Sequence, residues 1–120
     1  MKDRPQFRAQ LSRPADGVAV VTLEGEVDLY TAPEFEEVLL HAIDEGARHV
    51  VVDLSAVTFV DSTALGVLVA GGKRLLDGGR LRIVCHDDRI RRILTIAGLA
   101  GVFPVHLTLD EALTVAEWPG

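Results

Sequence analysis

Three polar residues that could carry chemistry stand between two apolar stretches in the middle of the chain: Asp61, Ser62 and Thr63. A buried strand is expected before them and an amphipathic helix after them, and the carboxyl ends of strands in α/β sheets are where ligand and partner sites collect. The same residue types cap helices, so capping alone could account for all three. No Glu or Gln follows three positions after any of them, unlike in other capping boxes of this chain.

Ser62 also offers a hydroxyl that a protein kinase could phosphorylate. A phosphoserine in the first turn of a helix lies at the positive end of the helix dipole, near free backbone N–H groups, where it gains about 0.3–1 kcal/mol. The fold should therefore survive the modification. At an interface, about −1.5 to −2 added charges beside Asp61 could cost ~3–5 kcal/mol of binding, or roughly 10² to 10⁴ in affinity. Such a loss is large enough for a switch.

Other chemistry finds little support. The histidines, His41, His49, His86 and His106, form no His-x-x-x-His pair, so the sequence predicts surface or strand-end histidines and no metal site. The single cysteine, Cys85, lies in an apolar run, which favours a small buried hydrophobic residue over a nucleophile. No cofactor is expected.

A glycine-rich stretch at residues 66–74 superficially resembles a phosphate-binding loop. One extra glycine separates the second required Gly from Lys73, and Arg74 stands where a magnesium-binding Ser or Thr is needed. We therefore expect helix interior here, and a nucleotide-binding or hydrolysing enzyme remains only an alternative.

The elements that must position these residues follow from hydrophobic periodicity. Strands are expected at residues 7–11, 18–24, 48–54, 81–85 and 102–106, and the last is confined to a sheet edge by Pro104. A turn is expected at residues 13–17. Helices are expected from Thr31 and Thr108, each with a capping box, from residue 65 to Gly78-Gly79, and from a cap at Asp87-Asp88 to Gly98. The last of these patterns, that after Thr108, reaches Ala116.

The resulting order, β-β-α-β-α-β-α-β-α, predicts a single α/β domain over residues 1–120 with its core at about 7–116. Crossover connections are expected to make a mostly parallel sheet of four or five strands, packed with about four helices. The first hairpin adds an antiparallel strand.

Charge and composition exclude several partner classes. The 120 residues include 48% hydrophobic residues and carry a formal net charge of −6, the wrong sign for binding nucleic acid or an anionic membrane. The longest stretch free of charged or strongly polar residues, 64–72, is far shorter than the roughly 20 residues of a bilayer span. No secretory signal is recognised at the start, so a cytoplasmic protein is expected.

Two segments, in this order and spacing, are similar to a known family. Gly25-Glu26-Val27-Asp28-Leu29-Tyr30-Thr31-Ala32-Pro33 resembles the "GELD…TAP" stretch of STAS domains, the anti-sigma factor antagonists of bacteria. Residues 51–66, which include Thr58-Phe59-Val60-Asp61-Ser62-Thr63, resemble their "DLSGVTFIDSSGLG" signature. The likeness in pattern covers nearly the whole chain. Ala64 stands where the family typically has Gly.

The resemblance implies a binding module and kinase substrate rather than an enzyme. Family members bind an anti-sigma factor that is also a serine kinase, and a Ser/Thr protein phosphatase reverses the phosphorylation. Carried over, Ser62 is the acceptor, Asp28 and Asp61 are interface or kinase-recognition acids, and Thr63 is the second hydroxyl residue. The expected loop at residues 55–60, with Thr58 and Phe59, is a further contact surface. Asp28 could instead be a strand-end turn residue.

A second possibility within the same resemblance is a STAS subunit of a lipid-transport ATPase or of a stress-signalling complex. The sequence does not identify the sigma factor, the kinase or the oligomeric state.

Overall fold

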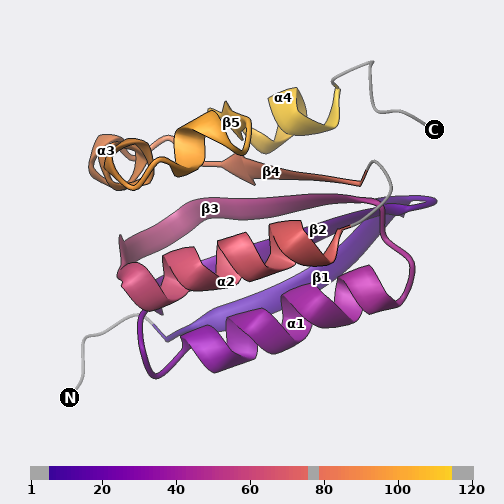
Figure 1. The fold of residues 1–120 in the computed structure, drawn as a ribbon, viewed down its shortest axis with the longest axis horizontal. Helices are drawn as coiled ribbons and strands as arrows, with labels where there is room; N and C mark the ends of the chain where they lie inside the picture. The colour runs from indigo at the N-terminus through magenta and orange to yellow at the C-terminus, as the bar shows by residue number, and fades with distance from the viewer. Residues whose placement is uncertain (1–5, 76–78, 115–120) are drawn as a thin grey trace.

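A single sheet runs through the computed structural model, which describes residues 6–75 and 79–114 (Figure 1). The strands are β1 (Arg8–Ala15), β2 (Val18–Val27), β3 (His49–Val60), β4 (Arg80–Val84) and β5 (Val105–His106). The helices are α1 (Ala32–Asp44), α2 (Ser62–Arg74), α3 (Asp88–Ile96), α4 (Leu109–Leu113) and a 3₁₀ turn, η1 (Leu99–Gly101). In the described residues the strand order is β1-β2-β3-β4-β5, with β1 antiparallel to β2 and every other pair parallel. The predicted fold class is confirmed.

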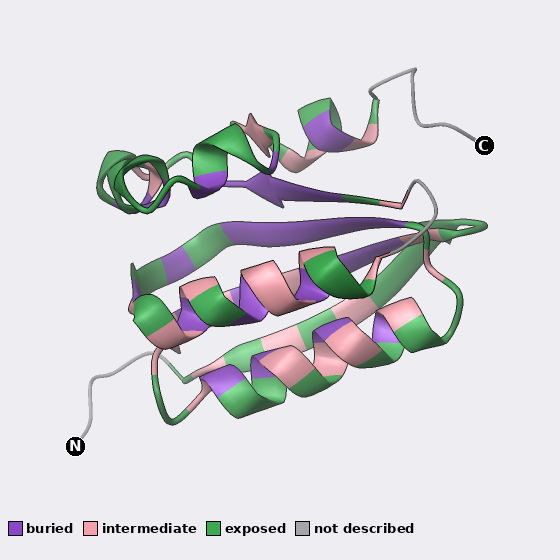
Figure 2. Cartoon of the chain, in the orientation of Figure 1, coloured by how far each residue is buried: buried purple, intermediate pink, exposed green. Residues whose placement is uncertain are grey.

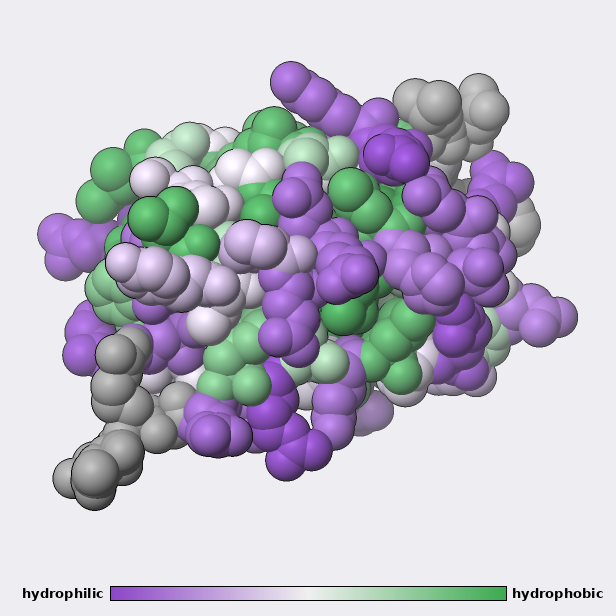
Figure 3. Space-filling model, turned by 90° about the horizontal axis from the view of Figure 1, so that it is seen from below, coloured by the Kyte–Doolittle hydropathy of each residue, from purple (hydrophilic) through white to green (hydrophobic). Residues whose placement is uncertain are grey.

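The two faces of the sheet are covered by different helices, because successive side chains of a strand point to opposite faces. Val50 and Val52 of β3 belong to the large core beneath α1 and α2, whereas Val51 packs with Ala112 of α4 on the other face. Figure 2 shows β3 as a mostly buried strand between these layers. The surface on the α1 side is mixed, with apolar patches between hydrophilic ones (Figure 3).

Two glycines of α2, Gly71 and Gly72, allow close packing. A Cβ on Gly71 would lie 2.6 Å from Leu39 Cδ2 on α1, and one on Gly72 would lie 2.7 Å from the Phe103 ring. Both glycines, with Gly66, lie inside α2, so the stretch is helix interior as predicted and not a phosphate-binding loop. The stop predicted at Gly78-Gly79 comes too late, because α2 ends at Arg74 and Leu75 is already extended; Gly78 itself lies outside the described residues.

β3 is longer than predicted. The pairing of β2 with β3 shifts twice, between Thr22 and Glu24 and between Gly25 and Glu26. At each shift, β3 has one residue more than the facing stretch of β2. Such bulges destroy the two-residue alternation that identifies a strand in a sequence. The expected loop at residues 55–60 was therefore wrong, and Thr58 and Phe59 lie on a strand.

The helix caps agree with the sequence at two of three helices. The Asp87 carboxylate accepts hydrogen bonds from the Arg89 and Ile90 backbone N–H groups, and the Thr108 hydroxyl accepts one from Glu111 N–H. The predicted box at Thr31 was wrong, because the Thr31 side chain makes no capping bond to α1.

Two strand predictions also change. β1 continues to Ala15, which leaves Asp16 and Gly17 to turn the chain. The strand expected at residues 102–106 is reduced to β5, because the chain turns through η1 and buries Phe103 first. The helix predicted after Thr108 is also shorter than its pattern, since α4 ends at Leu113; Ala116 lies outside the described residues.

Candidate functional site

The two segments singled out by their motifs meet at one end of the sheet. β2 ends at Val27 and β3 ends at Val60, and these residues pair in the parallel ladder. The Asp61 backbone N–H donates a 3.2 Å hydrogen bond to the Val27 carbonyl oxygen. The turn that begins at Asp28 and the start of α2 are therefore neighbours, at the carboxyl ends of adjacent parallel strands.

Asp61 is the N-cap of α2. Its Oδ1 accepts hydrogen bonds from the backbone N–H groups of Thr63, at 2.9 Å, and Ala64, at 3.3 Å. These bonds satisfy donors that have no partner within the helix. The expectation that a phosphate on Ser62 would find free N–H groups here was wrong for these two donors, since Asp61 already occupies them.

Ser62 is the first residue of α2 and is exposed. Within the described residues, neither its hydroxyl nor that of Thr63 makes a hydrogen bond. Capping therefore accounts for Asp61 alone. Thr63 is half-buried, and the Ala64 methyl group packs into the core. An alanine fits at position 64 because the helix interior and the core both accept it.

Asp28 organises the neighbouring turn. Its Oδ1 accepts hydrogen bonds from Tyr30 N–H at 2.9 Å and Thr31 N–H at 3.1 Å, the pattern of an Asx turn. The Thr31 hydroxyl closes the turn by donating to the Glu26 carbonyl at 2.8 Å and accepting from Asp28 N–H at 2.9 Å. This use of the hydroxyl explains the missing cap on α1. Asp28 is thus a strand-end turn residue, whatever else it contacts.

Large exposed apolar side chains lie on the same two segments as these polar groups. Leu29 and Tyr30, at the tip of the Asp28 turn, are 63% and 88% exposed, and Phe59 on β3 is 48% exposed. Thr58 is exposed as well, with its hydroxyl 3.5 Å from the Gly25 carbonyl oxygen. We call Asp28, Leu29, Tyr30, Thr58, Phe59 and residues 61–63 the switch surface. Exposed apolar groups beside carboxylates are typical of protein-binding sites.

Sequence reasoning missed Leu29 and Tyr30. The available signal was a pair of large apolar residues inside a turn, between a strand and a helix. Periodicity assigns no face to residues in a turn, so their exposure could not be derived from it.

The remaining chemically capable residues lie elsewhere. Cys85 is buried at the end of β4, and burial raises the pKa of its thiol, as expected of a packing residue. His49 starts β3 and His106 ends β5. Among the residues that the structure describes, no cluster of His, Cys, Asp or Glu could hold a metal ion.

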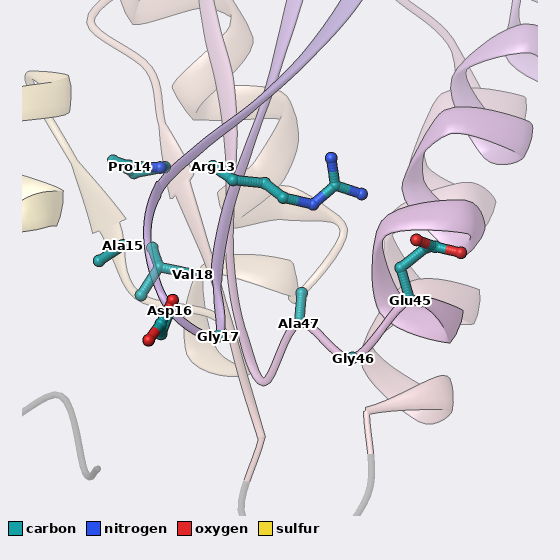
Figure 4. A pocket seen from close by; sticks show the side chains of 9 residues that line it. All are labelled: Arg13, Pro14, Ala15, Asp16, Gly17, Val18, Glu45, Gly46 and Ala47. Carbon is teal, nitrogen blue, oxygen red and sulfur yellow. The ribbon is translucent and has the colours of Figure 1, made fainter.

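A hollow of about 370 Å³ lies at the opposite end of the sheet (Figure 4). Arg13 of β1 and Glu45, just beyond the end of α1, lie on its two sides. The switch surface adjoins the beginning of α1 instead, so the hollow is separate from it.

Comparison with known proteins gives these residues a family. Residues 12–112 match the model of the STAS domain. The chain belongs to the STAS domain family. This STAS domain is 34% identical over 99 residues to the anti-sigma-F factor antagonist RsfB of Mycobacterium tuberculosis. The aligned residues cover 82% of this chain and 81% of the relative. The domain is 40% identical over 87 residues to the anti-sigma-B factor antagonist of Staphylococcus aureus, with 72% and 81% covered.

Solved structures agree with the STAS fold. A crystal structure of an anti-sigma factor antagonist from Mycobacterium paratuberculosis superposes with a TM-score of 0.85 at 34% identity, covering 91% of this chain and 92% of that one. The phosphorylated form of the Bacillus protein SpoIIAA superposes with a TM-score of 0.70 at 22% identity, covering 88% and 96%. Within residues 6–75 and 79–114, no helix has the length and apolar character needed to cross a membrane.

Proposed function

We propose that this STAS domain is an anti-sigma factor antagonist that is switched off by phosphorylation of Ser62. In its unmodified form it binds an anti-sigma factor that is also a serine kinase, and this frees the sigma factor. The observation that carries the proposal is the exposed Ser62 on the first turn of α2, next to a carboxylate fixed by its own capping bonds. The names of the relatives at 34% and 40% identity support the same role.

The switch surface is the proposed contact with the kinase. Leu29, Tyr30 and Phe59 supply apolar area for binding, and Asp28 and Asp61 supply negative charge at the rim. Thr58 and Thr63 lie within the same surface. Large exposed apolar side chains, aromatic ones above all, are common binding anchors.

The geometry supports an electrostatic mechanism for release. The Asp61 carboxylate already takes two N–H groups of the first turn, so a phosphate on Ser62 would add its charge beside an existing negative charge. About two further negative charges at a partly desolvated interface must be paired or must weaken binding. The helix itself keeps its cap, so we expect no unfolding.

The proposal extends to the rest of the cycle. A Ser/Thr protein phosphatase removes the phosphate, and the domain itself is a substrate and binding module rather than an enzyme. We propose that it acts in the cytoplasm, where a kinase finds ATP, and that it needs neither nucleic acid nor membrane insertion.

The test is to incubate the purified protein with its cognate kinase and ATP and to map the phosphate by mass spectrometry. We expect one phosphate, on Ser62, in the wild type and in Thr63→Ala, and none in Ser62→Ala. Ser12, exposed on β1 and remote from α2, provides a control through Ser12→Ala. A phosphate that persists in Ser62→Ala would contradict the proposal. Co-purification with a transporter ATPase in place of a kinase would favour the alternative of a transporter subunit.

A further inference from the structure

A groove of about 760 Å³ runs between β1 and α1. It is lined by half-buried apolar residues, by exposed residues of the Asp28 turn and of α1, and by two glutamates. The lining residues are Ala9, Leu11, Tyr30, Pro33, Glu34, Glu37, Val38 and His41. Ala9, Leu11 and Val38 pack against the core beneath, so the floor of the groove is apolar and fixed.

One wall of the groove is an open sheet edge. β1 is the edge strand of the sheet and pairs only with β2 among the described strands. Near the hairpin the edge is protected, because Pro14 lacks an N–H group and the ladder shifts between Ser12 and Ala15. Over residues 8–12 the pairing with β2 is regular and carries no such device. The unprotected part of the edge is therefore the part that borders the groove.

The other wall is acidic. Glu34 and Glu37 stand one turn apart on α1, and both are exposed. Within the described chain, neither side chain takes part in an ion pair or a hydrogen bond. Their charges are thus available to an incoming cationic group.

We propose that this groove binds an extended segment of a protein partner, which adds to β1 as a sixth strand. Its groove-facing side chains combine an apolar residue, packed over Leu11 and Val38, with Lys or Arg residues that reach Glu34 and Glu37. Strand addition of this kind obtains affinity from backbone hydrogen bonds and specificity from alternate side chains. The charges disfavour a second copy of this chain, because pairing β1 with itself would bring the two acidic walls together.

This inference goes beyond the proposed function and does not depend on Ser62. Tyr30 alone belongs to both the groove and the switch surface. A protein that cannot be phosphorylated should therefore still bind the segment.

The probe is the peptide acetyl-Lys-Thr-Val-Thr-Lys-amide, titrated into the isotope-labelled full chain and followed by NMR. Its Lys and Val side chains share one face of a strand. The control is the peptide with Glu in place of both Lys residues, which keeps the length and the β-strand pattern and reverses the charge. We expect saturable shifts confined to residues 8–12, to Tyr30 and to residues 33–41 with the Lys peptide, and none with the Glu peptide.

Two changes test the mechanism separately. Glu34→Lys combined with Glu37→Lys should weaken binding by at least about tenfold, as expected for two reversed charge pairs. Asp16→Lys combined with Glu45→Lys, at the far hollow, is the matched control and should leave the affinity unchanged.

N-methylation of the peptide tests strand addition itself. Methylating Val blocks one edge of the added strand, and methylating both Thr residues blocks the other. We expect one pattern to abolish binding and the other to be tolerated. Absence of shifts, shifts elsewhere, equal binding of the Glu peptide, tolerance of both methylation patterns, or self-association of the chain through β1 would each overturn the proposal.

Discussion

Replacing the Asp61 cap separates the structural role of this carboxylate from its electrostatic role. Asp61→Ala leaves two backbone donors, at 2.9 and 3.3 Å, without their acceptor. Loss of an N-cap costs about 1 kcal/mol, and since Asp61 is only half-buried, water can replace part of the lost bonding. Asp61→Asn keeps the acceptor oxygen and should stay within about 0.5 kcal/mol of the wild type, because Asn and Asp cap almost equally well.

Urea denaturation followed by circular dichroism measures both free energies of unfolding. Asp87→Ala is the matched control, because Asp87 caps α3 with bonds of 2.8 and 3.2 Å but lies outside the switch surface. We expect both alanine variants to lose stability, and only the Asp61 variants to change the affinity for the kinase. If Asp61→Asn lost as much stability as Asp61→Ala, or if Asp61→Ala lost none, the capping argument would be refuted.

Two further predictions concern packing and pH. In Gly66→Ala the new methyl group meets nothing within 4 Å, so the variant should stabilise α2 by up to about 1 kcal/mol. In Gly72→Ala the methyl group meets the Phe103 ring, so the variant should destabilise the fold by about 1–3 kcal/mol. Thermal and urea unfolding measure both changes, and equal effects of the two substitutions would contradict the close contact of Gly72 with Phe103. Burial, together with the Arg82 guanidinium 3.3 Å away, lowers the pKa of His106, so the unfolded chain binds this proton more readily. The contribution of neutral His106 to stability should be present above the ordinary pKa of 6.5 and lost as pH falls below it. His106→Gln should therefore reduce the fall in the free energy of unfolding with decreasing pH, as measured by denaturant titrations at several pH values.

The chemistry of the site could be predicted further than its shape. Asp61, Ser62 and Thr63 lie between a predicted strand and a predicted helix, and their residue types are those that begin helices. Which of the three makes the cap depends on where the chain leaves β3, and the structure assigns that role to Asp61. The Asp28 turn shows the limit. A Thr with Glu three residues later predicts a capping box, but Thr31 gains a stronger set of partners from the preceding turn.

The fold was predictable where periodicity is clean and not where bulges interrupt it. Leu54, Val57 and Val60 are buried at intervals of three residues, which is the spacing of neither a regular strand nor a long helical stripe. This segment is a strand because it pairs with β2, and each of the two bulges changes which residues of β3 point to the buried face. The residues of a strand do not identify the strand that they will pair with. The bulges could therefore not be foreseen, and the segment 55–60 was predicted as a loop.

The most direct test of the switch is the affinity of the cognate kinase for two forms of this protein, unmodified and phosphorylated on Ser62, measured by calorimetry under the same conditions. We predict that phosphorylation weakens binding by roughly 10² to 10⁴ while the circular dichroism spectrum stays the same. Equal affinities for the two forms would contradict the account, and so would a loss of affinity that comes with loss of the fold.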